Sequence, residues 1–137
     1  MRVDQETLVT WTGEKDVYEG GRLGGVQSLV DSDAVQGPSP VDSILLGLSA
    51  CMAIDVRMIL EKSRVPLTEL SVSAQAERNE TPPRRLLKVR LQYRLSGPGP
   101  EDQARVQRAI DLSRDRYCSV LHSLAPDIEL TIEVELG

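Results

Sequence analysis

Three stretches in the second half of the chain alternate apolar and polar residues. A period of two places every second side chain on the same face of a strand, so each stretch predicts a β-strand with one buried and one solvated face. We expect the first two strands to pair in antiparallel fashion and the third to repeat their scheme. The apolar positions are Leu70, Val72, Ala74 and Ala76 in the first stretch, Leu87, Val89, Leu91, Tyr93 and Leu95 in the second, and Ile128, Leu130, Ile132, Val134 and Leu136 in the third.

The solvated faces of the last two strands carry opposite charges. Opposite charges on neighbouring strands add about 0.2 to 1 kcal/mol for each opposed pair, so we expect these two strands to lie side by side. The basic row consists of Lys88, Arg90 and Arg94, and the acidic row of Glu129, Glu133 and Glu135.

A long helix is predicted from Ser39 to about Lys62. Ser39 takes the N-cap position, Pro40 the first helical position and Asp42 the third, from which a carboxylate can reach back to the cap. Apolar residues cover most of the helix circumference, which predicts that a sheet covers one side and something else covers the other. A chain of 137 residues has little left for that second side, so we infer a dimer.

The remaining elements complete a mixed fold. Short strands are predicted at residues 7–12, 17–19 and 26–30, a second helix from Pro100, and a short helix over residues 117–124. This order predicts an α+β fold, with helices against one face of an antiparallel sheet. The length fits a single domain that spans residues 1–137.

The charge balance argues against two classes of partner. The net charge is −5, whereas nucleic acids and anionic membrane surfaces attract clustered lysine and arginine. The amino terminus carries acids from Asp4 onward, unlike a secretion signal, and the apolar-rich run at residues 44–60 falls short of the roughly 20 residues that span a bilayer. We therefore expect a cytoplasmic protein that binds neither nucleic acid nor membrane.

Two cysteines and one histidine limit the metal and disulfide chemistry. Cys51 and Cys118 do not make a disulfide scaffold, and with His122 alone the usual spacing of paired zinc ligands is absent. We expect free thiols, either buried or reactive, and no metal or organic cofactor.

Two segments resemble the osmotically inducible protein C and organic hydroperoxide resistance (OsmC/Ohr) superfamily. SPVDSILLGLSACMAIDV is similar to the family's proline-containing entry to a central helix with its first cysteine, and AIDLSRDRYCSVLHSL to the segment with the second. The likeness covers nearly the whole chain, and is closest to an uncharacterised OsmC-like branch with Ala-Ile-Asp-Val and Tyr-Cys-Ser-Val signatures. It implies an intertwined homodimer with two long central helices between sheets and two active sites at the subunit interface.

The resemblance also implies a thiol-dependent peroxidase that reduces organic hydroperoxides. Cys51 would attack the peroxide oxygen, and Cys118 would resolve the sulfenic acid as a disulfide that an external dithiol reduces. Only a thiolate attacks peroxide fast, and burial raises a cysteine pKa above about 8.5, so a cation is needed beside Cys51. The family's arginine corresponds to Arg22, in the glycine-rich loop GGRLGG. Arg22 can equally be an ordinary solvated arginine.

Asp42 is the candidate carboxylate that would orient Arg22. Peroxidases of the family commonly carry a glutamate directly after the helix-entry proline, whereas here Val41 fills that position and Asp42 follows. Helix capping explains Asp42 without any catalysis, and the two roles can coexist.

The other polar residues near the thiols can each be explained by an ordinary structural role as well as by a catalytic one. Arg114 and Arg116 precede Cys118 near a predicted helix start, which would lower its pKa, but cysteine is also a common small buried residue. His122 either faces Cys118 across one helical turn or lies at the surface. A carboxylate at Asp55 opposes thiolate formation on the same helix face, so we expect it to pair with an arginine or backbone donors, within the chain or across the dimer, and not to act as a general base. The alternative is a satisfied polar residue near the end of the helix.

The functional hypotheses fall into different classes. The first is a Cys51/Cys118 peroxidase for organic hydroperoxides, with Arg22 as the cation and Asp42 as its orienter. The second is a non-catalytic dimer that binds a small apolar ligand or senses redox state, which the departure at Val41 favours. A purely structural dimer with vestigial thiols is the third.

Overall fold

The computed structural model describes residues 1–137 and divides into two compact units, Met1–Leu45 and Leu46–Gly137. Each unit contains its own three-stranded sheet, and the two sheets share no strand. The long helix α1 (Pro40–Lys62) begins in the first unit and continues in the second. The chain is therefore α+β, as the order of predicted elements indicated.

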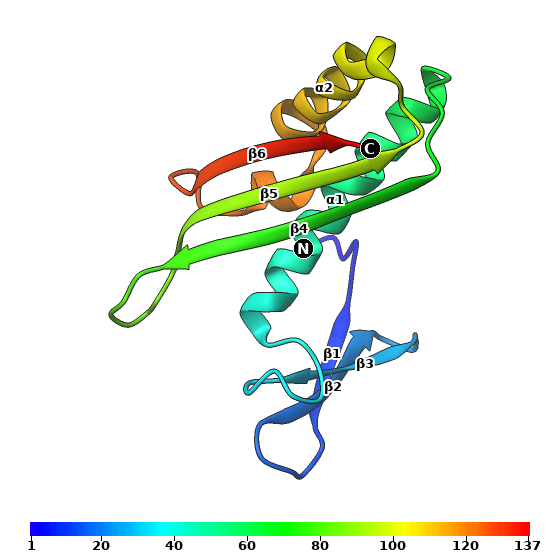
Figure 1. Cartoon of the computed structure of the whole chain (residues 1–137). Helices are drawn as coiled ribbons and strands as arrows, with labels where there is room; N and C mark the ends of the chain where they lie inside the picture. Colours follow the sequence, from blue (N-terminus) through cyan, green and yellow to red (C-terminus); the bar gives the residue numbers. More distant parts are fainter. The chain divides into compact units, whose positions relative to one another are not determined.

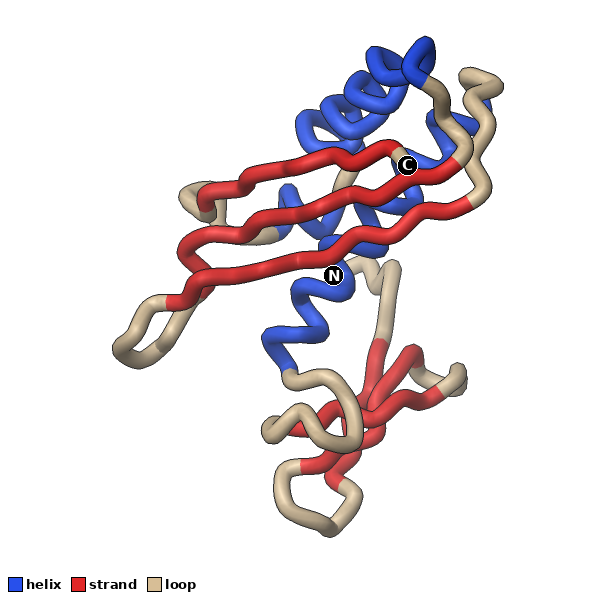
Figure 2. Tube along the Cα trace, in the orientation of Figure 1, coloured by secondary structure: helices blue, strands red, loops and turns tan.

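The first unit is an antiparallel sheet with the strand order β1-β2-β3 (Figures 1 and 2). Its strands are β1 (Thr7–Trp11), β2 (Val17–Arg22) and β3 (Gln27–Asp31). All three were predicted, but β2 runs past its predicted end because Gly20 and Gly21 continue the pairing with β1. A Cβ atom at Gly21 would overlap the backbone carbonyl of Val26, so a larger residue there would displace the hairpin backbone.

The start of α1 confirms the predicted capping box. The Ser39 hydroxyl accepts the backbone N–H of Asp42 at 3.1 Å, and the Asp42 carboxylate accepts the backbone N–H of Ser39 at 3.0 Å. These bonds satisfy two of the donors that a helix start leaves free, and Pro40, the first helical residue, has no N–H to satisfy. The helix ends at Lys62, where the sequence placed its end.

The second unit is a three-stranded sheet with helices on one face (Figure 1). The strands are β4 (Glu69–Arg78), β5 (Leu86–Ser96) and β6 (Glu129–Leu136), in the order β4-β5-β6. After β5 come the 3₁₀ turn η1 (Pro100–Asp102), α2 (Gln103–Leu112), the π-helical turn η2 (Ser113–Tyr117) and α3 (Ser119–Ser123). The helix from Pro100 and the short helix before Leu124 are both confirmed.

The last strand is parallel to its neighbour, which corrects part of the prediction. β4 and β5 are antiparallel as expected, but β5 and β6 are parallel, so β6 does not repeat the antiparallel scheme. The cause is the helical connection between the two strands. It crosses one face of the sheet and brings the chain back to the end at which β5 began, so β6 runs in the same direction as β5. The opposed charge rows are confirmed: Arg94 pairs with Glu135 at 3.1 Å, and Arg90 approaches Glu133 at 3.9 Å.

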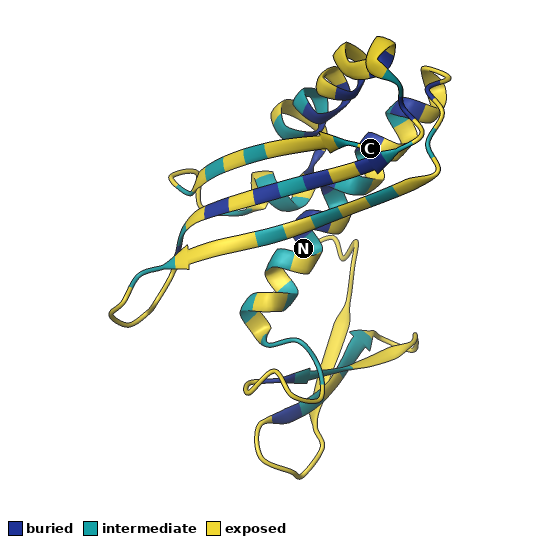
Figure 3. Ribbon diagram, in the orientation of Figure 1, coloured by how far each residue is buried: buried dark blue, intermediate teal, exposed yellow.

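The core of the second unit lies between the sheet and its helices. Buried and exposed residues alternate along β5 (Figure 3). The buried ones share one face of the strand, because alternate side chains of a strand point to the same side. On α1 the buried side chains recur at every fourth position, which forms one stripe along the helix. Residues of this core include Leu91, Tyr93 and Leu95 from β5, Leu48, Met52, Val56 and Leu60 from α1, and Val106 and Ile110 from α2.

A second stripe of α1 is apolar and exposed within the chain. It consists of Leu46, Ala50, Ile54 and Met58, again at every fourth position. The helix has 23 residues and by length and composition alone could cross a membrane, although buried helices of soluble proteins pass the same test. The prediction that this helix is too short to span a bilayer is therefore wrong. Its length and composition are still only weak support for a membrane span, because the stripe with Leu48, Met52, Val56 and Leu60 packs in the core.

Candidate active site

The Cys51 thiol lies on α1 beside the buried stripe of that helix. Cys51 lies three residues after the buried Leu48 and directly before the buried Met52, and its own side chain is half-buried. A sulfur at this position has the sheet core on one side and remains reachable on the other. Both cysteines of the chain are free thiols.

The Cys118 thiol lies where two helical segments meet. At η2 the helix widens, so that the backbone N–H of Cys118 bonds to the carbonyl of Ser113, five residues back, at 2.9 Å. Cys118 then leaves helical geometry and becomes the N-cap of α3, and its sulfur accepts the backbone N–H of Leu121 at 3.3 Å. The side chain is fully buried. This widened turn aims the second cysteine into the core, toward α1.

The start of α3 surrounds the Cys51 sulfur with hydrogen-bond donors. The Ser119 hydroxyl lies 3.9 Å from Cys51 Sγ, and the Cys118 thiol and the backbone N–H of Val120 also interact with that sulfur. The structure therefore brings together the two cysteines, which the sequence had paired only through a family resemblance.

The surroundings of Cys51 favour its thiolate. Burial alone would raise the pKa of the Cys51 thiol, but hydrogen bonds from the Val120 N–H, the Cys118 thiol and the Ser119 hydroxyl outweigh burial. Together they hold the pKa of Cys51 below its ordinary value, although the nearby Asp55 carboxylate acts in the opposite direction. The sequence predicts a cation in this role, whereas in the structure neutral donors supply part of the stabilisation of a sulfur that is only half-buried.

The surroundings of Cys118 favour its protonated form. Burial, together with the neighbouring Cys51, raises the pKa of Cys118 to about 11, against the opposing bond from the Leu121 N–H. The prediction that Arg114 and Arg116 would lower this pKa is wrong. Arg114 instead pairs with Asp115 at 2.8 Å and with Asp111 at 3.3 Å, and Arg116 is exposed. The two thiols therefore have opposite tendencies to ionise.

Asp55 has a partner that the sequence did not indicate. The Ser113 hydroxyl, which is fully buried, donates to Asp55 Oδ2 at 2.8 Å. Within the chain the partner of Asp55 is this serine, which the π-helical turn carries to α1, in agreement with the alternative of a satisfied polar residue. Asp55 is thus a hydrogen-bonded carboxylate one helical turn beyond Cys51.

Asp42 and Arg22 have well-defined local surroundings. The backbone N–H and the hydroxyl of Ser39 both lower the pKa of the Asp42 carboxyl, which serves as the helix cap described above. Arg22 ends strand β2, opposite Thr7, and does not lie in the predicted loop. Its side chain is exposed and has no ion-pair partner within the first unit.

His122 does not face the Cys118 sulfur. Its ring nitrogen Nδ1 lies 2.7 Å from the Cys118 carbonyl oxygen, and the side chain is exposed. Of the two alternatives left open by the sequence, the structure supports the surface position.

Four groups near the thiols were not identified from the sequence: the Ser119 hydroxyl, the Val120 N–H, the Ser113 hydroxyl and the Tyr93 phenol. The serines carried a weak signal, because both lie within five residues of Cys118. Tyr93 carried none, since it occupies an ordinary core position of a predicted strand.

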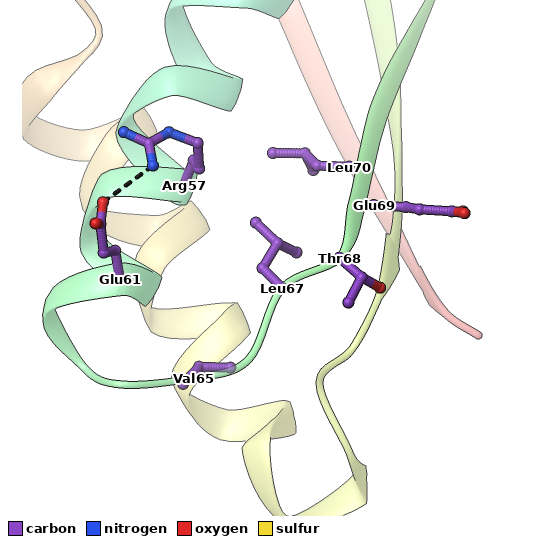
Figure 4. A pocket seen from close by; sticks show the side chains of 7 residues that line it. All are labelled: Arg57, Glu61, Val65, Leu67, Thr68, Glu69 and Leu70. Atoms are coloured by element: carbon purple, nitrogen blue, oxygen red, sulfur yellow. Dashed lines mark hydrogen bonds and ion pairs between the residues drawn. The ribbon is translucent and has the colours of Figure 1, made fainter.

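A pocket of about 410 Å³ lies at the far end of α1, near the start of β4 (Figure 4). Arg57 and Glu61 form an ion pair of 3.0 Å along one side of it. The lining residues are Arg57, Glu61, Val65, Leu67, Thr68, Glu69 and Leu70. Neither cysteine is among them, so this pocket is separate from the thiol site.

Removal of the Ser119 hydroxyl tests the electrostatics of the site. We expect Ser119→Ala to raise the pKa of Cys51, because the thiolate loses a donor worth about 0.5 to 1.5 kcal/mol, or about 0.4 to 1 pH unit. Alkylation of Cys51 by iodoacetamide, followed by mass spectrometry across pH, should slow by about 2- to 10-fold at neutral pH and reach the same plateau at high pH. Ser123→Ala, one turn later on α3, is the control and should leave the profile unchanged.

Comparison with known proteins places the chain in a family. Residues 31–133 match the family model described as OsmC-like protein. Protein YhfA of Escherichia coli (strain K12) is 34% identical over 132 residues, which cover 96% of this chain and 97% of YhfA.

Two solved structures illustrate the shared fold. An OsmC-like protein from Mycoplasma pneumoniae superposes with a TM-score of 0.82 at 17% identity, and covers 99% of both chains. An organic hydroperoxide resistance protein from Elizabethkingia anophelis gives a TM-score of 0.67 at 14% identity, over 100% of this chain and 99% of that one. Family match, relative and fold agree, and the chain belongs to the OsmC-like family.

Proposed function

We propose that this chain is a thiol-dependent peroxidase that reduces organic hydroperoxides, with Cys51 as the attacking thiol and Cys118 as the resolving thiol. The observation that carries the proposal is the proximity of two free thiols: Cys51 Sγ lies 3.9 Å from the hydroxyl of Ser119, the residue next to Cys118, and the two thiols have pKa values shifted in opposite directions. A peroxidase needs one sulfur that is ionised and reachable and a second that stays protonated until the first has been oxidised.

Burial assigns the two roles. Cys51 is half-buried, so a hydroperoxide can approach its sulfur, whereas Cys118 is fully buried and can meet only groups inside the protein. The lowered pKa of Cys51 supplies more thiolate at neutral pH, and the pKa of about 11 keeps Cys118 as a thiol. If Cys118 were the attacking thiol, the hydroperoxide would have to reach a sulfur that is fully buried.

The reaction proceeds in balanced steps. The Cys51 thiolate attacks the terminal peroxide oxygen, the O–O bond breaks, and the alkoxide takes a proton and leaves as an alcohol. Cys51 is now a sulfenic acid. Cys118 attacks its sulfur, the S–O bond breaks, and the hydroxyl leaves with the Cys118 proton as water. An external dithiol then reduces the disulfide by thiol exchange.

Arg22 is the proposed cation of the site, and Asp42 its proposed orienter. The neutral donors at the start of α3 lower the pKa of Cys51, and a guanidinium would add charge complementarity to both the thiolate and the developing alkoxide. The exposed guanidinium of Arg22 has no ion-pair partner in its own unit, which supports such a role. The Asp42 carboxylate has two oxygens, so it can cap α1 through one and bind Arg22 through the other.

The active form is proposed to be a homodimer with one 137-residue domain in each subunit. The exposed stripe of Leu46, Ala50, Ile54 and Met58 supports this, because an apolar helix face of this length is normally covered. Two such helices packed together would bury both stripes. The two free thiols suit a reducing compartment, and we propose that the dimer is cytoplasmic.

Names of similar structures support the substrate class. Three solved structures with this fold are described as organic hydroperoxide resistance proteins, from Elizabethkingia anophelis, Legionella pneumophila and Bacillus subtilis. Their identities to this chain are 11–15%, so the likeness itself is one of fold. The thiol pair, and not the fold, is what connects this chain to that chemistry.

A second candidate is a dimer that binds an apolar ligand or senses redox state. The observation that favours it is Val41, which takes the position where peroxidases of the family carry a glutamate, while Asp42 is already engaged with Ser39. A binder would hold its thiols reduced after one equivalent of peroxide, and a sensor would form the disulfide without turnover by a dithiol.

Replacement of the cysteines tests the peroxidase. With cumene hydroperoxide and a dithiol, the wild type should turn over and Cys51→Ser should consume peroxide at the uncatalysed rate. Cys118→Ser, assayed without the dithiol, should consume about one equivalent and keep Cys51 as a sulfenic acid that dimedone traps, because the internal disulfide cannot form. Unchanged consumption by Cys51→Ser would remove the assignment.

Replacement of Arg22 tests the cation. Arg22→Met keeps the length of the side chain and removes the charge, and we expect kcat/KM for cumene hydroperoxide to fall about 100-fold. Arg2→Met, at another exposed arginine of the first unit, is the matched control and should stay near wild type. A value within twofold of wild type for Arg22→Met, with Cys51→Ser inactive, would leave the thiols in place and exclude Arg22.

A charge on the exposed stripe tests the dimer. The subunit mass is 15.1 kDa, and we expect the wild type to sediment at twice that mass. Ile54→Lys should shift it toward the monomer, since a lysine in an apolar interface lacks a partner. Ala104→Lys, on the exposed side of α2, adds the same charge elsewhere and should remain dimeric. A wild type that is monomeric at micromolar concentration would contradict the dimer.

A further inference from the structure

The phenol of Tyr93 is a buried donor without an acceptor. Tyr93 is fully buried, and its hydroxyl is the buried side-chain polar atom of the chain that lacks a hydrogen-bond partner. A polar group in this state costs stability, and buried tyrosine hydroxyls usually find a partner. A phenylalanine would fill the same space without that cost, so the hydroxyl calls for a function.

The surroundings of the hydroxyl point to the thiol site. Val72 on β4 and Val134 on β6 stand beside Tyr93 in the sheet, so its strand neighbours supply no polar side chain. The ring faces the helix layer, where the charges that act on the hydroxyl are those of Cys118 and Asp55. Asp55 already accepts the Ser113 hydroxyl, whereas the Cys118 sulfur is the atom that changes state in the proposed reaction.

We propose that Tyr93 is a positioning residue for disulfide formation: its hydroxyl donates a hydrogen bond to the Cys118 sulfur as that thiol gives up its proton and bonds to Cys51. The inference rests on the proposed peroxidase function. In this step the S–S bond forms, the S–O bond of oxidised Cys51 breaks, and water leaves with the Cys118 proton. The phenol keeps its own proton throughout.

The chemistry of the phenol fits a donor and not a base. Burial, and then the charges of Cys118 and Asp55, hold the pKa of Tyr93 well above its ordinary value, so the hydroxyl stays protonated at every working pH. In the reduced structure the Tyr93 hydroxyl makes no hydrogen bond to the Cys118 sulfur. As negative charge develops on that sulfur, a neighbouring O–H donor becomes more favourable than it is beside the reduced thiol. The Tyr93 hydroxyl, which is unpaired in the reduced protein, is therefore free to donate to the Cys118 sulfur when that sulfur becomes negatively charged.

Other titratable groups lie around the Cys118 and Tyr93 side chains. Cys51 acts on the Cys118 sulfur from α1, Asp55 of the same helix acts on Tyr93, and His122 lies on α3 with its ring against the Cys118 carbonyl. His122 contacts the backbone and not the sulfur. Tyr93 is the one among them that can donate to the sulfur without changing its own charge.

Tyr93→Phe tests the proposal. Reduced protein is mixed with one equivalent of cumene hydroperoxide without a dithiol, quenched with acid or trapped with dimedone at intervals, and analysed by mass spectrometry. We expect the consumption of peroxide to be unchanged, the disulfide to form roughly 10- to 100-fold more slowly, and the dimedone adduct of Cys51 to accumulate. The rise of the disulfide rate with pH should shift upward by about 1 to 2 units.

Controls separate this role from a structural one. Tyr117→Phe removes a hydroxyl next to Cys118 in the sequence, but on an exposed side chain, and should behave as wild type. If Tyr93→Phe forms the disulfide at the wild-type rate with an unchanged pH profile, and only its Tm rises, the hydroxyl is merely unsatisfied and the proposal is overturned. If Tyr93→Phe does not fold, wild-type protein with 3-fluorotyrosine, a more acidic donor, should form the disulfide faster, and an unchanged rate would equally overturn it.

A second oxidant separates this inference from the proposed function. Diamide adds to a reachable thiolate, and a second thiol then displaces the reduced diamide to give the disulfide, with no peroxide chemistry. A wild type that does not consume peroxide refutes the peroxidase. A disulfide step that is independent of Tyr93 with both oxidants refutes the role of Tyr93 alone.

Discussion

The contact between α1 and the start of α3 is the constraint on which the thiol site depends. It places the Cys51 sulfur against the Ser119 hydroxyl and the Val120 N–H, and beside the Cys118 thiol. None of these groups is charged, yet together they offset the effect of burial on the Cys51 thiolate. The contact exists because the π-helical turn at Ser113–Tyr117 widens the chain just before Cys118, which lets one residue leave the helix, cap the next one and face α1.

The local features of the fold could be predicted from the sequence. The capping box of Ser39 and Asp42, the helix end at Lys62 and the strands all follow from short-range patterns, and the structure confirms them. The opposed charge rows were also found, because charge alternates in step with the strand period. The parallel direction of β6 was missed. Residue alternation fixes which face of a strand is buried but not the direction in which the strand runs.

The thiol site was harder to predict, because it depends on contacts between distant parts of the chain. The sequence indicated both cysteines, but the pKa of Cys118 was placed on the wrong side of its ordinary value. Neighbouring arginines suggested a lower pKa, whereas burial in three dimensions raises it. Ser113 carried only a weak signal and Tyr93 none, since a serine on a helix and a tyrosine on a strand are common, and only folding brings Ser113 to Asp55 and Tyr93 to the helix layer that holds Cys118.

The fold, and not the chemical identity of the cysteines, distinguishes the two thiols. Two neighbouring thiols oppose each other's ionisation, so the first to lose its proton raises the pKa of the other. Desolvation then decides which sulfur ionises first. Cys118 is fully buried beneath the sheet, whereas Cys51 is half-buried and meets three donors, so the charge favours Cys51. The protonated Cys118 becomes one of those donors. Its high pKa and the lowered pKa of Cys51 are therefore two aspects of one interaction, and a change at either sulfur must alter the other.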